Sequence, residues 1–461
     1  MALHQSARWT RVLAIFVLCF ALRLVVGLVI DATVPVIKRV DVYSDIAANL
    51  IRGHGFVVEV NGAPITWRAP LYPAFLAVLY GLFGEHNGTA VFIAQTALDS
   101  VSAVLIFWMG TRLFGESVGF FSAVVFALHP ISAYYSLRFM PEPLFTLAVV
   151  ATTAAWLAAV QSLRPIAFLG VGASIAVAAL VKPVALGLCP FLAAGALYRL
   201  RNDPRCAGIV VMALTLACLL VLAPWTLRNY RVTGNVVAVA TGGGYALWLG
   251  NQMVSEGQED WEVDDVTRAH LFDLRNAVFA TAEVSDHRVV SVSNSETTRS
   301  FIQPVNITVE EDRAFLHAAW REIASHPFDS AMLAVRKFFR FWFSIFLPEN
   351  RWAQFYIVIF QTLFLAFAVF GMMEGKQRGG ILFLLLPPVI FLTVIHAVTF
   401  ATIRYSLPAL AILTIFMSAG VREAVRALNE KFGMSVGVSL VRSVQAILLG
   451  KTGLSYQRRR S

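Results

Sequence analysis

The fold of this chain is decided by apolar runs such as VLAIFVLCFALRLVVGLVI, residues 12–30. A transmembrane helix needs ~20 predominantly apolar residues, and this run has that length. It follows Arg8 and Arg11, as the apolar part of a signal peptide does, but it is longer than such a part and lacks a clear small-residue cleavage site. The run is therefore expected to be an uncleaved first span.

Further apolar runs follow along the chain, separated by short basic turns. They predict spans at Ala90–Gly110, Val118–Leu128, Leu144–Val160, Ile166–Val181, Val184–Tyr198, Ala207–Leu222, Phe355–Met373, Ile381–Val398 and Leu407–Gly420. The run Pro70–Gly84 is short and interrupted by proline, which favours a re-entrant or interfacial helix. The sequence thus predicts an all-α polytopic membrane protein with about 10–12 transmembrane helices and an outer-face soluble insert of mixed α/β character.

The composition excludes a soluble enzyme. Of 461 residues, 58% are hydrophobic and only 14% are charged, whereas a soluble domain has about 25% charged residues. The net charge of +9 does not indicate nucleic-acid binding, because the basic residues stand in short turns and in the last part of the chain. Membrane topology requires basic residues at those places, so no nucleic-acid partner is expected.

The basic turns also predict the sidedness of the chain. With the N-terminus inside, the turns that contain Arg112, Arg164 and Arg378 all fall inside, as the positive-inside rule requires. Two segments then face outward, Asp31–Arg68 and Arg228–Arg351, and the second holds more than half of the acidic residues. We therefore expect a transmembrane catalytic module over 1–227 with its first outer loop at 31–68, an outer-face (periplasmic) domain over 228–351, C-terminal transmembrane helices over 352–421 and a basic cytoplasmic tail over 422–461.

The first outer loop contains two acidic residues at helical spacing. In VDVYSDIAANLIRGHGF, residues 40–56, Asp41 and Asp45 share one face of a helix that is predicted over residues 41–50. A carboxylate at such a place can act as a general base toward an acceptor hydroxyl. The alternative is that one of the two aspartates caps the helix.

A second set of charged residues stands at the outer ends of the predicted spans. Glu142 lies where an outer loop enters a span, and Lys182, Arg228 and Arg404 (the last followed by Tyr405) lie at or near other outer ends. Cations at bilayer depth are costly and usually face a cavity or a partner, and Arg and Lys both bind phosphate. The alternatives are a helix-start acid for Glu142 and snorkelling to lipid headgroups for each cation. Their shared side favours one anion-binding site.

The order of short motifs resembles that of the GT-C superfamily of membrane glycosyltransferases. The motifs are D-x-Y-x-x-x-A-x-N-L-x-x-G-x-G-F from Asp41, WRAPLYP from Trp67, PEPLF from Pro141, PWTLRNY from Pro224, GGYALWLGN from Gly243 and RYSLP from Arg404. Within the superfamily, the sequence is most similar to the protein O-mannosyltransferase and lipid A aminoarabinose transferase type. No P-loop, GxGxxG, GxSxG or HExxH motif is present, so nothing in the sequence favours ATP-driven transport or serine or zinc hydrolysis.

The resemblance implies an inverting transfer of a sugar from a polyprenyl-phosphate donor to a lipid, glycan or protein acceptor. It implies that Asp41 is catalytic and Glu142 is a second acid, and that Lys182, Arg228, Arg404 and Tyr405 hold the donor phosphate. Tyr43, Arg68 and Tyr72 lie in the matching motifs and are expected to contact substrate. Asp41 lies two residues before the tyrosine rather than three or four as in many relatives, so Asp45 remains an alternative catalytic acid.

The remaining expectations concern a bound metal ion, the location of the protein and an alternative function. Some members of the superfamily use a divalent metal, and this sequence has no ligand cluster that decides whether one is bound. The expected location is a bacterial inner membrane, with the active site facing the periplasm or the cell exterior. The alternative function is a lipid-linked sugar flippase or transporter, but such a protein is expected to have internal repeats, and none is found between the two halves of the sequence.

Overall fold

The structure of the protein is a computed structural model that describes residues 2–33, 42–60, 62–256, 258, 265–281, 289–291, 302–304, 306–343, 351–377 and 380–432. Its N-terminal part contains α1 (Ala2–Thr33), α2 (Val42–Ile51), α3 (Leu71–Phe83), α4 (Gly88–Phe114), α5 (Glu116–Leu128), α6 (Pro130–Ser136), α7 (Glu142–Ser162), α8 (Pro165–Val181), the 3-10 turn η1 (Pro183–Gly187), α9 (Leu188–Arg199) and α10 (Pro204–Thr233).

The remaining elements follow in the second half of the chain. They are α11 (Gly243–Gly250), η2 (Met253–Ser255), α12 (Asp265–Thr281), β1 (Val289–Ser291), β2 (Ile302–Pro304), α13 (Val309–Ser325), α14 (Pro327–Phe343), α15 (Arg351–Gln377), α16 (Ile381–Val398), η3 (Ile403–Ser406) and α17 (Leu407–Phe432). The two strands pair antiparallel, with Val290 opposite Gln303. The expected basic cytoplasmic tail over 422–461 is described only as far as residue 432.

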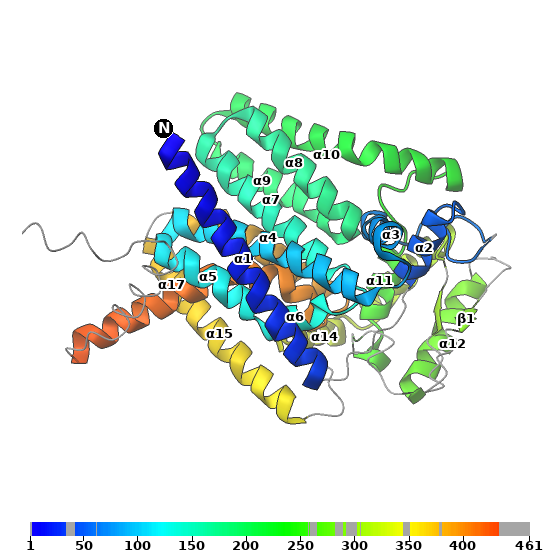
Figure 1. The fold of residues 1–461 in the computed structure, drawn as a ribbon. Helices are drawn as coiled ribbons and strands as arrows, with labels where there is room; N and C mark the ends of the chain where they lie inside the picture. The colour runs from blue at the N-terminus through cyan, green and yellow to red at the C-terminus, as the bar shows by residue number, and fades with distance from the viewer. Residues whose placement is uncertain are drawn as a thin grey trace, which may run out of the picture.

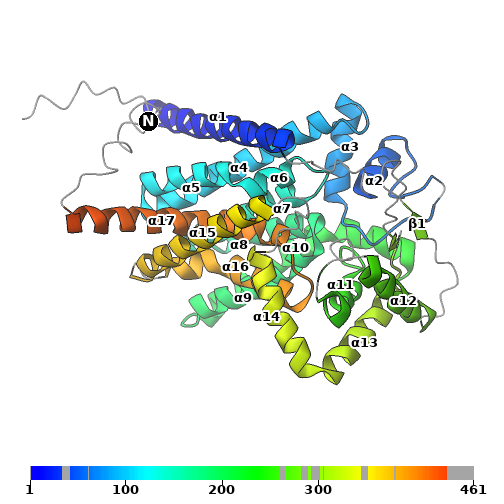
Figure 2. The same ribbon diagram turned by 90° about the horizontal axis from the view of Figure 1, so that it is seen from below.

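The long helices lie side by side in a bundle, and the shorter elements gather at one end of it. Figures 1 and 2 show α2, α3, α11, α12 and β1 together at that end, whereas the start of α1 and the C-terminal end of α17 lie at the opposite end. The predicted first loop and the predicted insert therefore occupy the same end of the molecule. The basic start of the chain and the basic end of α17 occupy the other.

The helix lengths confirm the predicted fold class of an all-helical, multi-pass membrane protein. Among the described residues, six helices are long and apolar enough to cross a membrane, or seven if the bent pair α5 and α6 counts as one span. Four shorter apolar helices accompany them, at Leu71–Phe83, Pro165–Val181, Pro183–Arg199 and Ile357–Met373. The predicted number of about 10–12 spans is therefore approached only when shorter helices are included.

Close contacts between glycines and neighbouring backbones draw the helices together. At Gly172 in α8, a Cβ atom would lie 2.0 Å from the carbonyl oxygen of Leu214 in α10. Gly371 in α15 and Gly420 in α17 face each other in the same way, each with a backbone oxygen of the other helix about where a side chain would be. Small residues allow helices to approach closely in membranes, where packing rather than the hydrophobic effect joins them.

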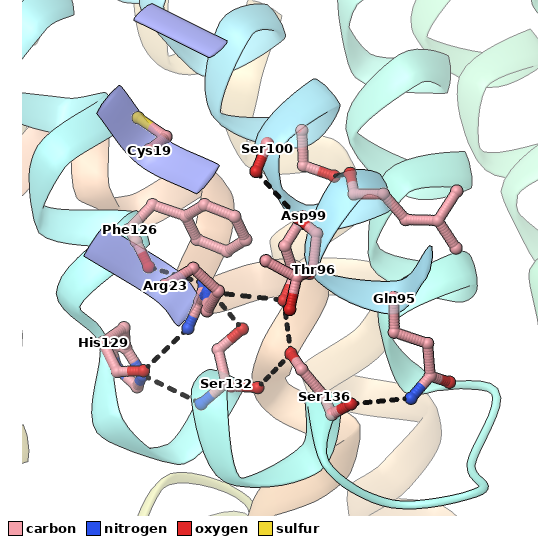
Figure 3. Close-up of polar contacts among 12 residues, drawn as sticks. Cys19, Arg23, Gln95, Thr96, Asp99, Ser100, Phe126, His129, Ser132 and Ser136 are labelled. Atoms are coloured by element: carbon pink, nitrogen blue, oxygen red, sulfur yellow. Dashed lines mark hydrogen bonds and ion pairs between the residues drawn. The ribbon is translucent and has the colours of Figure 1, made fainter. Parts of the chain in front are cut away.

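A buried polar network joins α1 to the break between α5 and α6 (Figure 3). The Arg23 guanidinium donates to the carbonyl oxygens of Phe126 (2.7 Å) and His129 (3.0 Å) and lies 3.4 Å from Asp99. Ser136 donates to the same Asp99 carboxylate. These carbonyls lie where α5 ends and α6 begins at a 54° bend, and each also accepts a backbone N–H. The network therefore ties the middle of α1 to the bend.

The sequence predicts an outer loop before Glu142, and within this stretch residues 130–136 form the short helix α6. The short helix is started by His129, whose ring accepts from the backbone N–H of Ser132, and by Pro130 in its first turn.

Two segments of the insert have sequence patterns that can be compared with the structure. The pattern of Val309–Ser325 predicts a helix, which is confirmed as α13 and begins with a capping box between Thr308 and Glu311. The pattern of Val236–Ala240 predicts a strand, and this prediction is wrong, because the structure has no strand at these residues. The carbonyl groups of this segment accept from side chains of α10 instead, with the Asn229 amide and the Trp225 indole both donating to Val239, so no partner strand is needed there.

Helix α14 has two different faces. Its buried stripe contains Leu333, Lys337 and Phe341, whereas Phe328, Met332, Val335 and Phe339 form an exposed apolar stripe at helical spacing.

Candidate active site

Glu142 forms the centre of a buried ion-pair cluster. It begins α7 directly after Pro141 and is only 2% exposed. Its Oε1 accepts a hydrogen bond from the Lys182 ammonium at 2.8 Å and lies 3.9 Å from Nε of Arg404. Three segments that are far apart in the sequence thus meet at one carboxylate oxygen.

Local sequence places Lys182 and Arg404 at helix breaks. Lys182 follows the last residue of α8 and has an extended backbone (φ −140°, ψ 121°), the conformation that a following proline, here Pro183, favours. Arg404 stands in the single turn η3, whose start is capped by the Thr402 hydroxyl accepting from the backbone N–H of Arg404. At such breaks the side chains can leave the helix surface and converge.

Tyr405 joins the two cations. Arg404 donates to the Tyr405 hydroxyl at 2.6 Å, and the Lys182 ammonium lies 4.8 Å from the centre of the Tyr405 ring. Arg404 also contacts the sulfur of Met140, two residues before Glu142, at 3.5 Å. The structure therefore brings together four of the predicted residues, namely Glu142, Lys182, Arg404 and Tyr405.

The cluster carries one positive charge in excess, since two cations face one carboxylate. Electrostatic attraction is stronger in such a buried place than in water. The other carboxylate oxygen of Glu142, Oε2, is buried and has no hydrogen-bond partner within the described part of the chain. The arrangement can hold an anion against Lys182 and Arg404 while Glu142 still offers an oxygen to a hydroxyl donor.

His396 is a member of this region that the sequence analysis did not single out. Its ring stacks on that of Tyr405 at a centroid distance of 4.4 Å and an angle of 10°, and its Nδ1 lies 3.2 Å from the carbonyl oxygen of Phe400. The sequence shows only a histidine inside an apolar run. Such a residue is usually a core side chain whose hydrogen bonds are satisfied, so it does not indicate a site.

Tyr43, Arg68 and Tyr72 form a second group at the first loop. The Arg68 guanidinium lies 5.2 Å from the Tyr43 ring and 3.8 Å from the Trp67 ring, and Tyr43 meets Tyr72 edge to face at 5.3 Å. The Tyr72 hydroxyl donates to Gln95 at 3.0 Å. Gln95 in turn donates to the carbonyl oxygens of Ser136 and Arg138. This group is therefore tied to the segment that leads to Glu142.

Of the two candidate aspartates, only Asp45 is among the described residues. It is in the first turn of α2 and is partly exposed, while Asp41 lies just outside the described residues. The neighbouring Ser44 holds α2 in place, because its hydroxyl contacts the Tyr80 hydroxyl and the Nδ1 of His86 (3.0 Å).

Arg228 has a different environment from the one expected for a phosphate ligand. It donates to the carbonyl oxygen of Ile65 at 2.7 Å and to the Asn229 side chain at 3.1 Å. Its guanidinium also lies over the rings of Trp225 and Phe56. These contacts connect α10 to the first loop.

The described residues contain no group of three or more His, Cys, Asp or Glu side chains that could hold a metal ion. Glu142 is a poor metal ligand in this arrangement, because two cations already face its carboxylate. The residues around Glu142 therefore do not fit a divalent metal.

Comparison with known proteins gives both a family match and fold matches. Residues 67–227 match the family of dolichyl-phosphate-mannose-protein mannosyltransferases, about a third of the chain that includes Glu142 and Lys182. No curated protein matches the sequence.

Among solved structures, the chain resembles the archaeal oligosaccharyltransferase AglB from Archaeoglobus fulgidus in complex with an inhibitory peptide and a dolichol-phosphate. The identity is 10%, the TM-score is 0.51, and the match covers 95% of this chain and 54% of that one. The A. fulgidus oligosaccharyltransferase tethered to an acceptor peptide gives a TM-score of 0.54 at 9% identity, over 95% and 55% of the two chains. ArnT from Cupriavidus metallidurans bound to undecaprenyl phosphate gives 16% identity and a TM-score of 0.40, over 90% and 79%.

The two oligosaccharyltransferase matches bear on the fold over nearly the whole chain, although the chain spans only about half the length of those proteins. They agree with the resemblance that the order of sequence motifs indicated. The protein therefore has the fold of the GT-C membrane glycosyltransferases, and its residues 67–227 match the dolichyl-phosphate-mannose-protein mannosyltransferase family.

Proposed function

We propose that this protein is an inverting glycosyltransferase that moves a sugar from a polyprenyl-phosphate donor to an envelope glycolipid, glycan or protein at the outer face of a bacterial inner membrane. The observation that carries the proposal is the buried contact of Lys182 and Arg404 with Glu142 beside Tyr405. Support for a glycosyltransferase also comes from the family match over residues 67–227.

The cations suit the leaving group of this reaction. In the transfer, an acceptor hydroxyl oxygen bonds to the anomeric carbon while the bond from that carbon to the phosphate oxygen breaks. The electron pair of the broken bond stays on the phosphate, which is a stable anion and needs no proton. Lys182 and Arg404 stabilise the charge that develops there, and preorganised groups of this kind supply much of the rate enhancement in many enzymes.

The acceptor proton goes to a carboxylate of the first loop. We assign this role to Asp41, with Asp45 as the alternative. Asp45 is in the first turn of α2, which lies at the same end of the bundle as α11 and α12 of the insert, and Asp41 directly precedes that helix in the sequence. Glu142 orients the sugar or the acceptor through Oε2. Attack from the side opposite the phosphate inverts the anomeric carbon.

The other predicted site residues have supporting roles in this proposal. Tyr43, Arg68 and Tyr72 shape the first loop and contact substrate, and Arg228 holds that loop to α10. The outer-face domain at 228–351 selects the acceptor, between the transmembrane module at 1–227 and the C-terminal helices at 352–421. The positions of the basic turns support a periplasmic or exterior active site, and the known binding of dolichol-phosphate by AglB supports a lipid-linked donor.

The test uses the purified protein in liposomes with labelled undecaprenyl-phosphate sugars and envelope extracts as acceptors. The wild type is expected to transfer label, and Arg404→Gln is expected to lower kcat/KM by about 10²–10³-fold, the usual effect of removing one charge-stabilising donor. Arg426→Gln is the matched control, because Arg426 lies on α17 in an exposed pair with Glu423. Movement of intact donor across the bilayer without transfer would favour a flippase instead.

A further inference from the structure

Lys337 on α14 is a fully buried lysine with three acceptors around its ammonium group. Its exposed fraction is 0%. Nζ donates to the carbonyl oxygens of Val398 (2.9 Å) and Gly250 (3.0 Å) and to Oδ1 of Asn251 (3.2 Å). An ammonium group has three N–H donors, so this geometry uses all of them.

These contacts join three segments of the chain at one point. Val398 ends α16, Gly250 ends α11, and Lys337 lies in the middle of α14. The Asn251 amide also donates to Val398 at 3.0 Å. Around this joint the backbones touch, because a Cβ on Gly250 would lie 2.1 Å from the carbonyl oxygen of Thr399. The contacts of Lys337 and Asn251 with Val398 therefore fix the position at which the chain leaves α16.

The segment fixed in this way leads directly into the ion-pair cluster. Residues 399–402 connect α16 to η3, which carries Arg404 and Tyr405. One turn after Lys337, the Phe341 ring stacks against His396 at 5.7 Å and 21°. His396 in turn stacks on Tyr405, and the Lys182 ammonium lies over the same tyrosine ring. Helix α14 thus contacts this segment twice, through Lys337 and through Phe341.

Burying the Lys337 ammonium group costs free energy that an apolar side chain at the same position would not cost. Burial lowers the pKa of its ammonium group to about 7, and an apolar side chain of similar length would avoid that cost. The three acceptors favour the charged form, because a neutral amine can satisfy only two of them.

We propose that Lys337 is a positioning residue that sets Arg404 and Tyr405 against the donor phosphate by fixing the α16–η3 connection. The proposal rests on the proposed function and assigns to α14 the task of holding the phosphate end of the site. Since α14 follows α13 of the insert directly, α14 links the insert to the segment that carries Arg404 and Tyr405.

The test compares Lys337→Met with Arg336→Met. Arg336 is a matched control at the preceding residue, and its side chain is 57% exposed. Lys337→Met is expected to raise the donor KM by about tenfold at unchanged acceptor KM, which corresponds to ~1.4 kcal/mol of lost binding. Arg336→Met should leave both constants unchanged. A purely structural role would lower the active fraction, and hence kcat, at unchanged donor KM, and that result would overturn the proposal.

Two further measurements keep the test decisive. If Lys337→Met does not fold, Phe341→Leu replaces it, because it loosens the ring stack without removing a buried charge; a raised donor KM supports the proposal and an unchanged one refutes it. If the wild type transfers no sugar, the proposed function fails. The positioning role of Lys337 is then tested by the affinity for undecaprenyl phosphate, measured as the thermal stabilisation that this lipid gives to the wild type and to the variant. Weaker stabilisation in the variant supports the positioning role, and equal stabilisation excludes it.

Discussion

Glu142, Lys182 and Arg404 each stand where one helix has ended or another begins. Residues in the middle of a span point at neighbouring helices, whereas residues at breaks can turn toward a common point. Pro183 follows Lys182 directly and favours an extended backbone there, which agrees with the end of α8 at Val181. Pro143 lies in the first turn of α7, where proline is tolerated. The helix ends allow the three side chains to converge.

The two aspartates of the first loop can be separated by single substitutions. Asp41→Asn is expected to lower kcat by about 10²–10⁴-fold, the typical contribution of a general base, while Asp45→Asn retains most of the activity. The two variants are compared by their transfer rates at saturating donor, and circular dichroism confirms that both are folded. The opposite order of the two rates would assign the base to Asp45, and near-normal turnover in both would remove the first loop from the chemistry.

Single residues show how far the sequence predicts this site. Glu142, Lys182 and Arg404 could be found because charge at a span end is unusual and its physical cost is known, whereas Tyr405 was named only as the neighbour of Arg404. Lys337 and His396 could not be found, since one resembles an ordinary basic residue of an amphipathic helix and the other a core residue. Their importance comes from contacts with segments distant in the sequence, and no spacing rule records those contacts. Arg228 has the right residue type, yet its described contacts are with the first loop.

At the scale of helices, the bend between α5 and α6 depends on a charge from another helix. Arg23 lies in the middle of α1 and is 1% exposed, and its carbonyl contacts belong to the residues at the bend. The apolar run Val118–Leu128 predicted α5, but neither α6 nor the bend was predicted. The side chain that contacts the bend belongs to α1, which precedes it by about a hundred residues.

Removing this charge should destabilise the bundle. Arg23→Met is expected to lower the free energy of unfolding by about 3–5 kcal/mol, because it leaves Asp99 as a buried carboxylate without its cation. Arg11→Met is the control on the same helix, since its pair with Glu116 is about two-fifths exposed and contributes about 1 kcal/mol at most. Thermal unfolding in detergent measures both variants, and equal shifts would contradict a special role for the buried pair.

At the scale of the whole molecule, the bilayer makes much of the fold predictable. Each predicted apolar span except Val184–Tyr198, which is divided between η1 and α9, lies within a single helix of the structure. A chain in lipid must satisfy its backbone groups internally, and a helix does so. How the helices pack was not predictable in the same way. The close approach of α8 to α10 depends on which glycine faces a neighbour, and Gly170 and Gly172 look alike in the sequence.

This difference between the two glycines can be measured. Gly172→Ala is expected to cost about 1–3 kcal/mol of stability, because the added methyl group collides with the backbone of Leu214. Gly170→Ala meets nothing within 4 Å, and alanine is the better helix former by ~1 kcal/mol, so this control should be neutral or slightly stabilising. Chemical unfolding in detergent compares the two, and equal effects would mean that α8 and α10 can separate without loss.

The two faces of α14 lead to different tolerances for substitution. Phe328, Met332, Val335 and Phe339 point away from the rest of the chain, so any apolar side chain there preserves the helix and its neighbours. Lys337 and Phe341, on the other face, have no substitute that matches their partners. During divergence, the outer stripe of α14 is therefore free to change with the surroundings of the protein, while the inner stripe keeps the spacing of four residues between a lysine and an aromatic ring.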